Sequence, residues 1–300
     1  MKILLTGANG FLGRYVNDYF LNQKIEVVKI GKSNQNDIIC DFSIEVPKLL
    51  TSTFNLVVHL AGKAHFTPVN KEQAQTFYDI NVLGTKNLLE GIGNLPSKPK
   101  AFVYISTVSV YGLQSGMNIN ELSLLIAKDA YGHSKILAEK MIEDWCRRNN
   151  VICTILRPPL IIGINPLGNL KSMVEGIKSG YYVNIGKGKA KKSMVLAKDI
   201  AKFIQIIFPI GGIFNVTDGI HPSFFDFSNH IAVITQSRQP KSISFKLALV
   251  LAKLGDLIGS RFPINSEKLL KLTSDLTFDD SKARNVGWKS TPVIEDFNIL

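Results

Sequence analysis

The sequence contains few cysteines and no apolar run long enough to cross a membrane. Its 300 residues include three cysteines, Cys40, Cys146 and Cys153, which form no CxxC or Cys/His metal pattern. We therefore expect unpaired thiols, no metal site and a reducing, cytoplasmic environment. The apolar stretch at residues 203–214 is too short for a membrane span and contains a proline and two glycines. The opening MKILLTG enters an apolar strand directly, which predicts no signal peptide.

The chain also lacks low-complexity tracts, and acidic residues are fewer than basic ones. Apolar residues make up 45% and charged residues 20%, so the whole chain is expected to fold. Lysines and arginines number 35 against 24 acids, and the formal net charge of +11 indicates an anionic partner. Charge alone does not distinguish nucleic acid, membrane headgroups, phosphorylated metabolites or a merely basic surface. Because no arginine-rich or aromatic-interleaved stripe is present, we expect no nucleic-acid partner.

Short β-rich runs alternate with longer helical patterns in the first half of the chain. Near-continuous apolar strands separated by helices predict a parallel sheet covered on both faces, an α/β fold of the Rossmann-type, doubly wound kind. Strands are expected at residues 2–6, 26–30, 55–60, 101–106 and 151–156, and helices near 11–22, 71–92 and 129–149.

After residue 157 the pattern is less regular. Helices are expected near 169–179, 199–208, 223–235, 246–258 and 266–272, and a strand near 212–216 that returns to the main sheet. We expect two lobes with a cleft between them. The larger is residues 1–157 plus the strand and helix near 193–217, and the smaller, mixed α/β lobe is residues 158–192 and 218–300.

The motif TGANGFLG (6–13) lies directly between the first strand and the first helix. Its glycines Gly7, Gly10 and Gly13 allow a tight turn, bring backbone N–H groups against a pyrophosphate and permit close helix packing. The spacing is GxxGxxG rather than GxGxxG. The strand–turn–helix context favours dinucleotide binding over a plain loop.

The motif AYGHSK (130–135) places Tyr131 and Lys135 on one face of a helix, because they are four residues apart. A nearby ammonium is expected to lower the pKa of the tyrosine by favouring phenolate. Alone, such a pair is more often a surface tyrosine beside a solvated lysine. The segment YISTVSVYG (104–112) adds hydroxyls, including Thr107, that can hydrogen-bond a substrate oxygen near this tyrosine.

With these motifs the chain resembles the extended short-chain dehydrogenase/reductase family, and within it the nucleotide-sugar epimerases, dehydratases and 4-ketoreductases. The resemblance covers nearly the whole chain. It implies an NAD(P)-dependent enzyme of polysaccharide biosynthesis that binds a nucleotide-diphosphate sugar, UDP-linked, in the smaller lobe. It also implies a homodimer formed through the helices near 71–92 and 129–149. The further motifs that carry it are HLAGKAH (59–65), NVLGTKNLL (81–89), LRPPLIIG (156–163) and FDDSKARNVGW (278–288).

The resemblance implies a role for each matching position. Thr107 matches the catalytic Ser/Thr, Tyr131 the proton-transferring tyrosine, and Lys135 the lysine that also holds the nicotinamide ribose. The remaining cofactor positions are Gly7, Gly10, Phe11 and Leu12 at the pyrophosphate turn, Asp41 and Phe42 beside adenine, Leu60, Ala61 and Gly62 after the third strand, Asn81, and Pro158 near the nicotinamide.

For the nucleotide sugar, the resemblance implies contacts from Asn169 and Leu170 at the start of a helix, from the strand at 183–185, and from Lys192. Many members have arginine about where Lys192 falls. Lysine keeps a positive charge for the diphosphate but lacks the bidentate fork. The alternative is that Lys192 belongs to a solvated basic loop.

The residues after Thr107 argue against one reaction of the family. Its 4,6-dehydratases have an acidic pair there, and one of these acids serves in water elimination. This chain has Val108 and Ser109 instead. Epimerisation at C4 and reduction of a C4 ketone remain.

The segment VVKIGKS (27–33) favours NADP(H), with NAD(H) as the alternative cofactor. Gly31 stands where a carboxylate would bind the ribose of NAD and repel a 2′-phosphate. Lys32 and Ser33 can approach that phosphate, and Arg14 adds a second cation.

An NADP(H) preference favours a reductase, because a reductase consumes reduced cofactor whereas an epimerase returns its hydride to the same substrate. We therefore expect reduction of the C4 ketone of a UDP-4-keto-6-deoxy-HexNAc sugar. The alternative is a UDP-hexose or UDP-HexNAc 4-epimerase. A non-catalytic dinucleotide-sensing protein is a lesser alternative.

Overall fold

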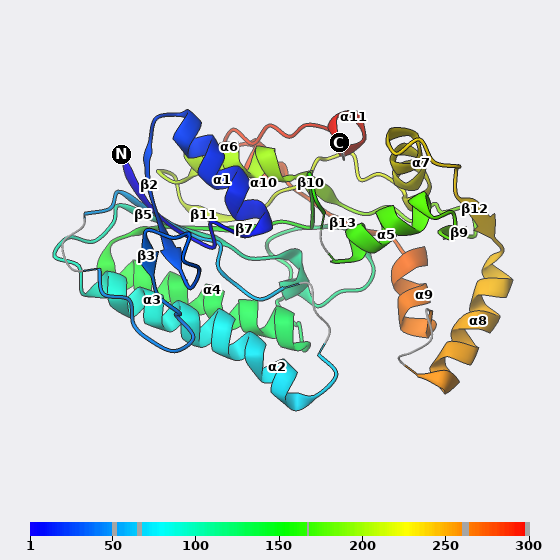
Figure 1. The fold of residues 1–300 in the computed structure, drawn as a ribbon, viewed down its shortest axis with the longest axis horizontal. Helices are drawn as coiled ribbons and strands as arrows, with labels where there is room; N and C mark the ends of the chain where they lie inside the picture. The colour runs from blue at the N-terminus through cyan, green and yellow to red at the C-terminus, as the bar shows by residue number, and fades with distance from the viewer. Residues whose placement is uncertain (50–52, 65–67, 167, 260–263, 298–300) are drawn as a thin grey trace.

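The computed structural model describes residues 1–49, 53–64, 68–166, 168–259 and 264–297. His65, the last residue of the HLAGKAH motif, lies outside these ranges. Figure 1 shows a sheet with helices at one end of the molecule and a smaller group of helices and short strands at the other.

A parallel sheet covered on both faces forms the larger part (Figure 1). Its strand order is β11-β7-β5-β4-β1-β2-β3, and each neighbouring pair is parallel. This confirms the predicted Rossmann-type, doubly wound α/β fold. β4 and β5 are buried along their whole length, which is why they read as unbroken apolar runs. The strands are β1 (Lys2–Thr6), β2 (Glu26–Gly31), β3 (Ile38–Ile39), β4 (Leu56–His59), β5 (Ala101–Ile105), β7 (Ile152–Arg157) and β11 (Gly212–Asn215).

The order of the strands reverses between β1 and β4. β2 and β3 extend the sheet on one side of β1, and β4, β5, β7 and β11 extend it on the other. Doubly wound proteins bind ligands in the crevice that forms at such a point, outside the carboxyl ends of the strands. The glycine-rich turn follows β1 and the LAG segment follows β4, so both lie at this crevice.

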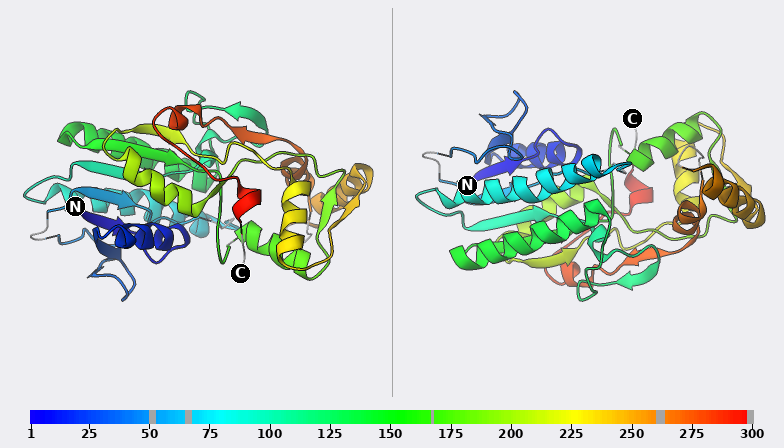
Figure 2. Two further views of the ribbon diagram at one scale, coloured as in Figure 1. Left: turned by 90° about the horizontal axis from the view of Figure 1, so that it is seen from above. Right: turned by 90° about the horizontal axis from the view of Figure 1, so that it is seen from below.

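Helices on the two faces of the sheet make two apolar cores. α1 (Phe11–Asn22) and α6 (Ala197–Ile207) pack on one face. On the opposite face lie α2 (Lys71–Tyr78), α3 (Gly84–Gly93) and α4 (Ala130–Asn149), as Figures 1 and 2 show. The helix predicted near 71–92 is interrupted by one π-helical turn, η1 (Asp79–Leu83), between α2 and α3.

The smaller part has its own apolar cores. One core joins α5 and α7 to β8 and β10, and another joins α8 to α9. On this basis we propose the division into residues 1–157 with 193–217, and 158–192 with 218–300. The elements of the smaller part are β8 (Leu160–Ile162), β9 (Val183–Ile185) paired with β12 (Lys241–Ile243), α5 (Gly168–Lys178), α7 (Phe224–Ile234), α8 (Phe245–Ile258) and α9 (Ser266–Thr273). β8 pairs with β10 (Met194–Leu196) of the larger part, so this pair joins the two parts.

Short elements connect the two parts. β6 (Gly116–Ile119) pairs with β13 (Leu276–Phe278), so the loop after β5 meets the segment after α9. The 3₁₀ helix η2 (Val108–Tyr111) follows β5, and α10 (Ser281–Arg284) and α11 (Val293–Asp296) close the chain.

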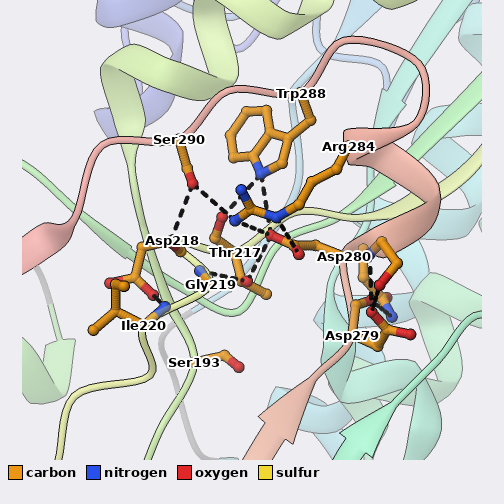
Figure 3. Close-up of polar contacts among 12 residues, drawn as sticks. Ser193, Thr217, Asp218, Gly219, Ile220, Asp279, Asp280, Arg284, Trp288 and Ser290 are labelled. Atoms are coloured by element: carbon orange, nitrogen blue, oxygen red, sulfur yellow. Dashed lines mark hydrogen bonds and ion pairs between the residues drawn. The ribbon is translucent and has the colours of Figure 1, made fainter.

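The closing motif FDDSKARNVGW anchors the end of the chain to the segment after β11 (Figure 3). Arg284 Nε donates to Asp280 Oδ1 at 2.8 Å, and Thr217 Oγ1 donates to Asp280 Oδ2 at 2.9 Å. Trp288 Nε1 donates to the carbonyl oxygen of Thr217 at 2.9 Å. A cavity of about 410 Å³ lies beside this cluster. Because Asp280 and Arg284 bond to each other and Asp218 accepts backbone N–H groups, the cluster acts as a structural anchor.

Two cysteines that match no sequence motif are neighbours in the fold. Cys146, near the end of α4, hydrogen-bonds with Cys153 of β7, and this bond and burial raise the pKa of Cys146. Both are free thiols, as is the buried Cys40. The seven-residue spacing conceals this pair because the chain turns back between α4 and β7.

Candidate active site

The glycine-rich turn brings the amino end of α1 to the crevice between β1 and β4. Gly7 has a left-handed backbone, with φ +70°, and a Cβ there would lie 2.7 Å from the backbone nitrogen of Ala61. A Cβ on Gly13 would overlap the carbonyl oxygen of Gly7, so α1 can approach the turn only because residue 13 is glycine. Gly10 is the N-cap of α1 and makes no side-chain cap. The first N–H groups of α1 are therefore left for an anion.

The next residues of α1 have different surroundings. Leu12 is buried in the core on this face of the sheet. Phe11 contacts the ring of Tyr15 edge-on, with centroids 5.9 Å apart. Arg14 Nε donates to the carbonyl oxygen of Asn9 at 3.3 Å, so its guanidinium lies over the glycine-rich turn.

The end of β2 has no carboxylate, since Gly31 is its last residue and Lys32 and Ser33 follow. Asn36 folds the next loop back, because its Nδ2 donates to the carbonyl oxygen of Ser33 at 3.0 Å. The Oδ1 of Asn36 accepts from Asn9 Nδ2 at 3.3 Å. These two asparagines join the loop after β2 to the glycine-rich turn. The sequence motifs give no signal for this role.

Lys32 and Asp41, which were predicted from separate segments, interact electrostatically. Hydrogen bonds from Ser43 hold the pKa of Asp41 below its ordinary value, and the positive charge of Lys32 acts in the same direction. Asp41 Oδ1 accepts from the backbone nitrogen of Ser43 at 3.0 Å and from its Oγ at 2.6 Å. The Phe42 side chain is buried in the core, which leaves only its backbone for contact with an adenine.

A buried polar chain underlies the crevice. His59 is 1% exposed, its Nδ1 lies 2.7 Å from Thr6 Oγ1, and its Nε2 lies 3.0 Å from Thr85 Oγ1. Thr6 Oγ1 also accepts the N–H groups of Leu60 at 3.1 Å and Ala61 at 3.0 Å. Burial lowers the pKa of His59 to about 3, so its imidazole stays neutral. This chain fixes the LAG segment, and the sequence shows His59 only as part of a motif.

Thr107 and Tyr131 meet where β5 ends and α4 begins. Thr107 is the N-cap of η2, and its Oγ1 accepts from the backbone nitrogen of Ser109 at 3.2 Å. Burial raises the pKa of Tyr131, and a hydrogen bond with Thr107 acts in the opposite direction. Asp129, which caps α4 by accepting from the Gly132 backbone nitrogen at 2.9 Å, raises the pKa of Tyr131 further.

Lys135 lies one helical turn beyond Tyr131 and is 6% exposed. Its Nζ donates to the carbonyl oxygen of Ile105 at 2.7 Å and lies 4.1 Å from the centre of the Tyr104 ring. Burial lowers the pKa of Lys135 to about 7, and the charge of Glu139 opposes this.

The prediction that Lys135 lowers the pKa of Tyr131 is wrong. The pKa of Tyr131 is raised, because burial disfavours a phenolate more than its hydrogen bond with Thr107 favours it. The ammonium of Lys135 is held instead by the carbonyl oxygen of Ile105. At neutral pH Tyr131 is therefore a protonated group that can donate its proton.

Asn81 lies in the π-helical turn η1 and joins two sides of the crevice. Its Oδ1 accepts from the backbone nitrogen of Lys63 at 2.7 Å, and its Nδ2 donates to Ser134 Oγ at 2.9 Å. A Cβ on Gly62 would lie 3.0 Å from Asn81 Oδ1 and 3.9 Å from Lys135 Nζ. The segment after β4 and the helix α4 are thus held together beside Lys135. The contacts of Asn81 in this structure therefore hold the fold together.

Pro158 lies beside the threonine loop, because its carbonyl oxygen accepts from the backbone nitrogen of Val108 at 3.1 Å. The preceding residue, Arg157, makes a bidentate ion pair with Glu139, at 3.1 Å from Nε and 2.6 Å from Nη2. Ser106 Oγ is buried next to Thr107 and has no hydrogen-bond partner among the residues that the structure describes.

The residues predicted to bind the sugar nucleotide lie in the smaller part of the fold. Asn169 is exposed in the first turn of α5, whereas the Leu170 side chain is buried in the core, so only its backbone is available. Lys192 is not a solvated side chain. Its Nζ donates to the carbonyl oxygen of Ser274 at 2.8 Å and lies 5.9 Å from the centre of the Phe224 ring. Burial lowers the pKa of Lys192 to about 8.

These features fit a dinucleotide. The glycine turn is a cradle that a Cβ would fill, and the capless start of α1 offers N–H groups to a pyrophosphate. The orphaned Ser106 hydroxyl and the Lys135 ammonium lie at the other end of the crevice, where a nicotinamide and its ribose would be held. The fold and the site define a dinucleotide-dependent oxidoreductase.

Comparison with known proteins narrows this class. Residues 3–216 match the NAD dependent epimerase/dehydratase family, and the chain belongs to that family. It is therefore an enzyme of the extended short-chain dehydrogenase/reductase type that uses an NAD(P)-type dinucleotide, which confirms the predicted family.

The chain is similar along most of its length to several characterised enzymes. It is 27% identical over 303 residues to an N-acetyl-α-D-glucosaminyl-diphospho-ditrans,octacis-undecaprenol 4-epimerase of Escherichia coli O157:H7, which covers 96% of this chain and 90% of the relative. It is 27% identical over 209 residues to a GDP-6-deoxy-D-talose 4-dehydrogenase of Aggregatibacter actinomycetemcomitans, covering 68% and 69%. A UDP-glucuronic acid 4-epimerase from Bacillus cereus, solved with NAD, shares the fold with a TM-score of 0.75, at 21% identity and coverage of 99% and 96%.

Proposed function

We propose that the enzyme reduces the C4 ketone of a UDP-linked 4-keto-6-deoxy-HexNAc sugar with NADPH. The observation that carries this proposal is the end of β2, where Lys32 and Ser33 follow Gly31 and no acid stands at residue 31. The neutral Tyr131 phenol beside Thr107 supplies the proton donor that a reduction needs. Reduction of a ketone needs a proton donor at the oxygen that becomes a hydroxyl, whereas oxidation of a hydroxyl needs a base. A protonated phenol at neutral pH suits the reduction.

Each catalytic side chain has one task in this proposal. Tyr131 donates its proton to the oxygen on C4, and Thr107 donates a hydrogen bond to the same oxygen. Lys135 places a positive charge beside the nicotinamide ribose. The dinucleotide, when bound, supplies hydride to C4.

The cofactor end of the site supports NADPH over NADH. No carboxylate stands at the end of β2, and Lys32 and Ser33 follow Gly31 directly. Arg14 folds over the glycine-rich turn toward the same region, which Asn9 and Asn36 join to the β2 loop. Two cations, with no carboxylate at residue 31, suit a 2′-phosphate better than a ribose hydroxyl.

We propose that the enzyme binds its substrate through a nucleotide diphosphate group. Lys192 brings a half-buried positive charge to the smaller lobe, and the first turn of α5 offers backbone N–H groups. Substrates of the relatives, such as UDP-glucuronic acid for the Bacillus cereus enzyme, support a sugar attached to a diphosphate.

A C4 epimerase is the second candidate, and a specific observation favours it. The Escherichia coli relative that matches over 96% of this chain is a 4-epimerase of a lipid-linked N-acetylglucosamine. The same Thr107, Tyr131 and Lys135 would then move a proton off O4 and return it, and the cofactor would not be consumed. Dinucleotide sensing without turnover has the least support, because the family consists of enzymes and the three residues are present.

The experiment that separates these candidates uses purified protein in three reactions. The first holds a UDP-4-keto-6-deoxy-HexNAc with NADPH, the second UDP-GlcNAc or UDP-glucose without added cofactor, and the third a polyprenyl-diphosphate-linked GlcNAc without added cofactor. We expect stoichiometric loss of NADPH absorbance in the first reaction. Interconversion of C4 epimers in the second or third, with no such loss in the first, would assign an epimerase. Inactivity in all three, with dinucleotide still bound, would favour sensing.

We also propose a cytoplasmic homodimer formed through α2, α3 and α4. The proposal rests on the family resemblance and on a surface groove of about 380 Å³ between α2 and α4, lined by residues that include Tyr78 and His133. Tyr78 is exposed there, as an interface residue would be in a single copy. The free thiols Cys40, Cys146 and Cys153 suit a reducing compartment.

A further inference from the structure

α8 turns its small residues toward the protein and its large apolar residues toward solvent. Ala248 and Ala252 are fully buried, and they pack with Leu269 of α9. A helix on the surface of a soluble domain has the opposite arrangement, with leucines inside and small or polar residues outside. Six large apolar residues of α8 are between 45% and 85% exposed. Phe245 is the first residue of the helix, and the other five are Leu247, Val250, Leu254, Leu257 and Ile258.

These five residues form one continuous stripe, which we call the α8 stripe. Their spacing of three, four, three and one residues keeps them on one face of the helix. Single exposed leucines need no explanation, but a contiguous apolar stripe marks a surface that contacts a membrane or another molecule.

Positive charge borders the α8 stripe. Lys246 and Lys253 are two turns apart, so they lie along the same edge of the helix, and both are exposed. Asp256, the acid of α8, already accepts from the Ser266 backbone nitrogen at 3.0 Å. Over residues 241–274 the sequence has six basic residues and two acids. A partner with negative charge next to apolar groups would complement this surface.

The helix α8 lies away from the central sheet. Figures 1 and 2 show α8 at the outer end of the smaller lobe, at the opposite end of the molecule from the edge strands β2 and β3. No helix among the described residues is long and apolar enough to span a membrane.

We propose that α8 docks this enzyme on an anionic membrane surface. The α8 stripe enters the boundary between headgroups and acyl chains, and Lys246 and Lys253 face the acidic headgroups. This inference holds for a reductase and for an epimerase alike, because it concerns a surface outside the site of reaction.

A second copy of the chain is a poorer occupant for this surface. A two-fold symmetric contact through α8 would bring the same basic edge of each copy together. Lys246 and Lys253 would then face lysines of the other copy, with no acid of α8 free to compensate, and like charges at an interface are unfavourable.

The test is co-sedimentation of the full chain with lipid vesicles. One set contains phosphatidylcholine with about one-third phosphatidylglycerol, and the other contains phosphatidylcholine alone. We expect binding to the first set that weakens as salt is added, and at least about tenfold weaker binding to the second. Leu257→Trp should show a blue shift of tryptophan emission with the anionic vesicles, because residue 257 would leave water.

Two double variants make the test specific. Leu254→Glu/Leu257→Glu should lower binding to anionic vesicles by about tenfold or more, because it places charge in the α8 stripe. The matched control, Ile44→Glu/Ile210→Glu, alters two exposed isoleucines outside the smaller lobe and should bind as the wild type does. Unchanged thermal melting and NADPH binding in both variants would show that they fold.

Three results would overturn the proposal. One is equal recovery with both kinds of vesicle, and another is binding that the α8 variant retains in full. The third is a wild-type dimer in sedimentation equilibrium that binds no vesicles and that Leu254→Glu/Leu257→Glu dissociates, which would assign the stripe to a second copy.

Discussion

Burial sets the protonation states of the side chains around the reaction centre. It raises the pKa of Tyr131, lowers that of Lys135 to about 7 and lowers that of His59 to about 3. At neutral pH the phenol is therefore a proton donor, the imidazole beneath the crevice carries no charge, and Lys135 is near its midpoint. Tyr131 thus keeps its proton through the neutral range, whereas Lys135 gains and loses one there.

Tyr131→Phe should abolish turnover and leave NADPH affinity nearly unchanged, because it removes the hydroxyl that donates the proton and keeps the ring in place. Thr107→Val should be milder, lowering kcat by about 10²-fold, as the loss of one oxyanion contact does. Steady-state kinetics and fluorescence titration with NADPH measure the two effects. Normal activity in Tyr131→Phe would contradict the assignment of the proton donor.

Lys32→Glu should reverse the cofactor preference. The wild type is expected to bind NADPH more tightly than NADH, and the variant places a negative charge where the 2′-phosphate would lie. Titration of both cofactors measures the order, and Lys24→Glu, at an exposed lysine in the turn before β2, is the control that should leave it unchanged. Equal affinity of the wild type for the two cofactors would remove the main support for a reductase over an epimerase.

The pKa of Lys192 predicts how substrate affinity depends on pH. Burial lowers this pKa to about 8, so the ammonium is present below that pH and is lost as the pH rises through it. Affinity for UDP, measured by calorimetry, should therefore fall above about pH 8 while NADPH affinity is followed as a control. Lys192→Arg should keep UDP affinity at the higher pH, because arginine stays charged. The same decline in Lys192→Arg would mean that another group titrates.

At the scale of elements, one face of α4 holds both the proposed catalytic residues and the acid that fixes the helix to the sheet. Tyr131, Lys135 and Glu139 follow each other at intervals of four residues, so they lie along one side of the helix. Glu139 makes the buried ion pair with Arg157 of β7, and Arg157 Nη1 also donates to the Tyr111 hydroxyl at 3.1 Å. The rotation of α4 about its axis, and so the position of the phenol, is fixed by this pair.

Glu139→Gln should destabilise the protein by about 3–5 kcal/mol, because it leaves the Arg157 guanidinium buried without a counter-charge. Urea unfolding measures the change. The matched control is Asp144→Asn, which breaks an exposed ion pair with Arg147 on the same helix and should cost about 0–1 kcal/mol. Equal losses in the two variants would contradict an anchoring role for the buried pair.

The sequence predicts the long elements well and the short strands poorly. β1, β4 and β5 are apolar on both faces, so they stand out as unbroken runs, and α1 and α4 carry clear helical patterns. β8, β9 and β12 have three residues each, and their partners are distant in the sequence. Such short strands form because the tertiary fold brings their partners together, and no local pattern records that.

At the scale of the whole molecule, the motifs reveal the reacting groups but not the contacts between motifs. Thr107, Tyr131 and Lys135 are readable because their spacing is local. The chain from Thr6 through His59 to Thr85 joins residues that are far apart in the sequence, and only the pairing of β1 with β4 brings them together. The raised pKa of Tyr131 likewise follows from burial, which spacing does not report.

The proposed division of the chain into two lobes predicts where ligands act. NADPH alone should slow amide hydrogen exchange in residues 7–14 and 60–62, because these segments line the crevice between β1 and β4. Addition of UDP should then slow exchange in α5 and near Lys192, whose side chain spans to Ser274. UDP without NADPH serves as the control and should protect the smaller lobe alone. Protection of residues 7–14 by UDP, with α5 unchanged, would contradict both the division of the chain and the assignment of the smaller lobe to the nucleotide sugar.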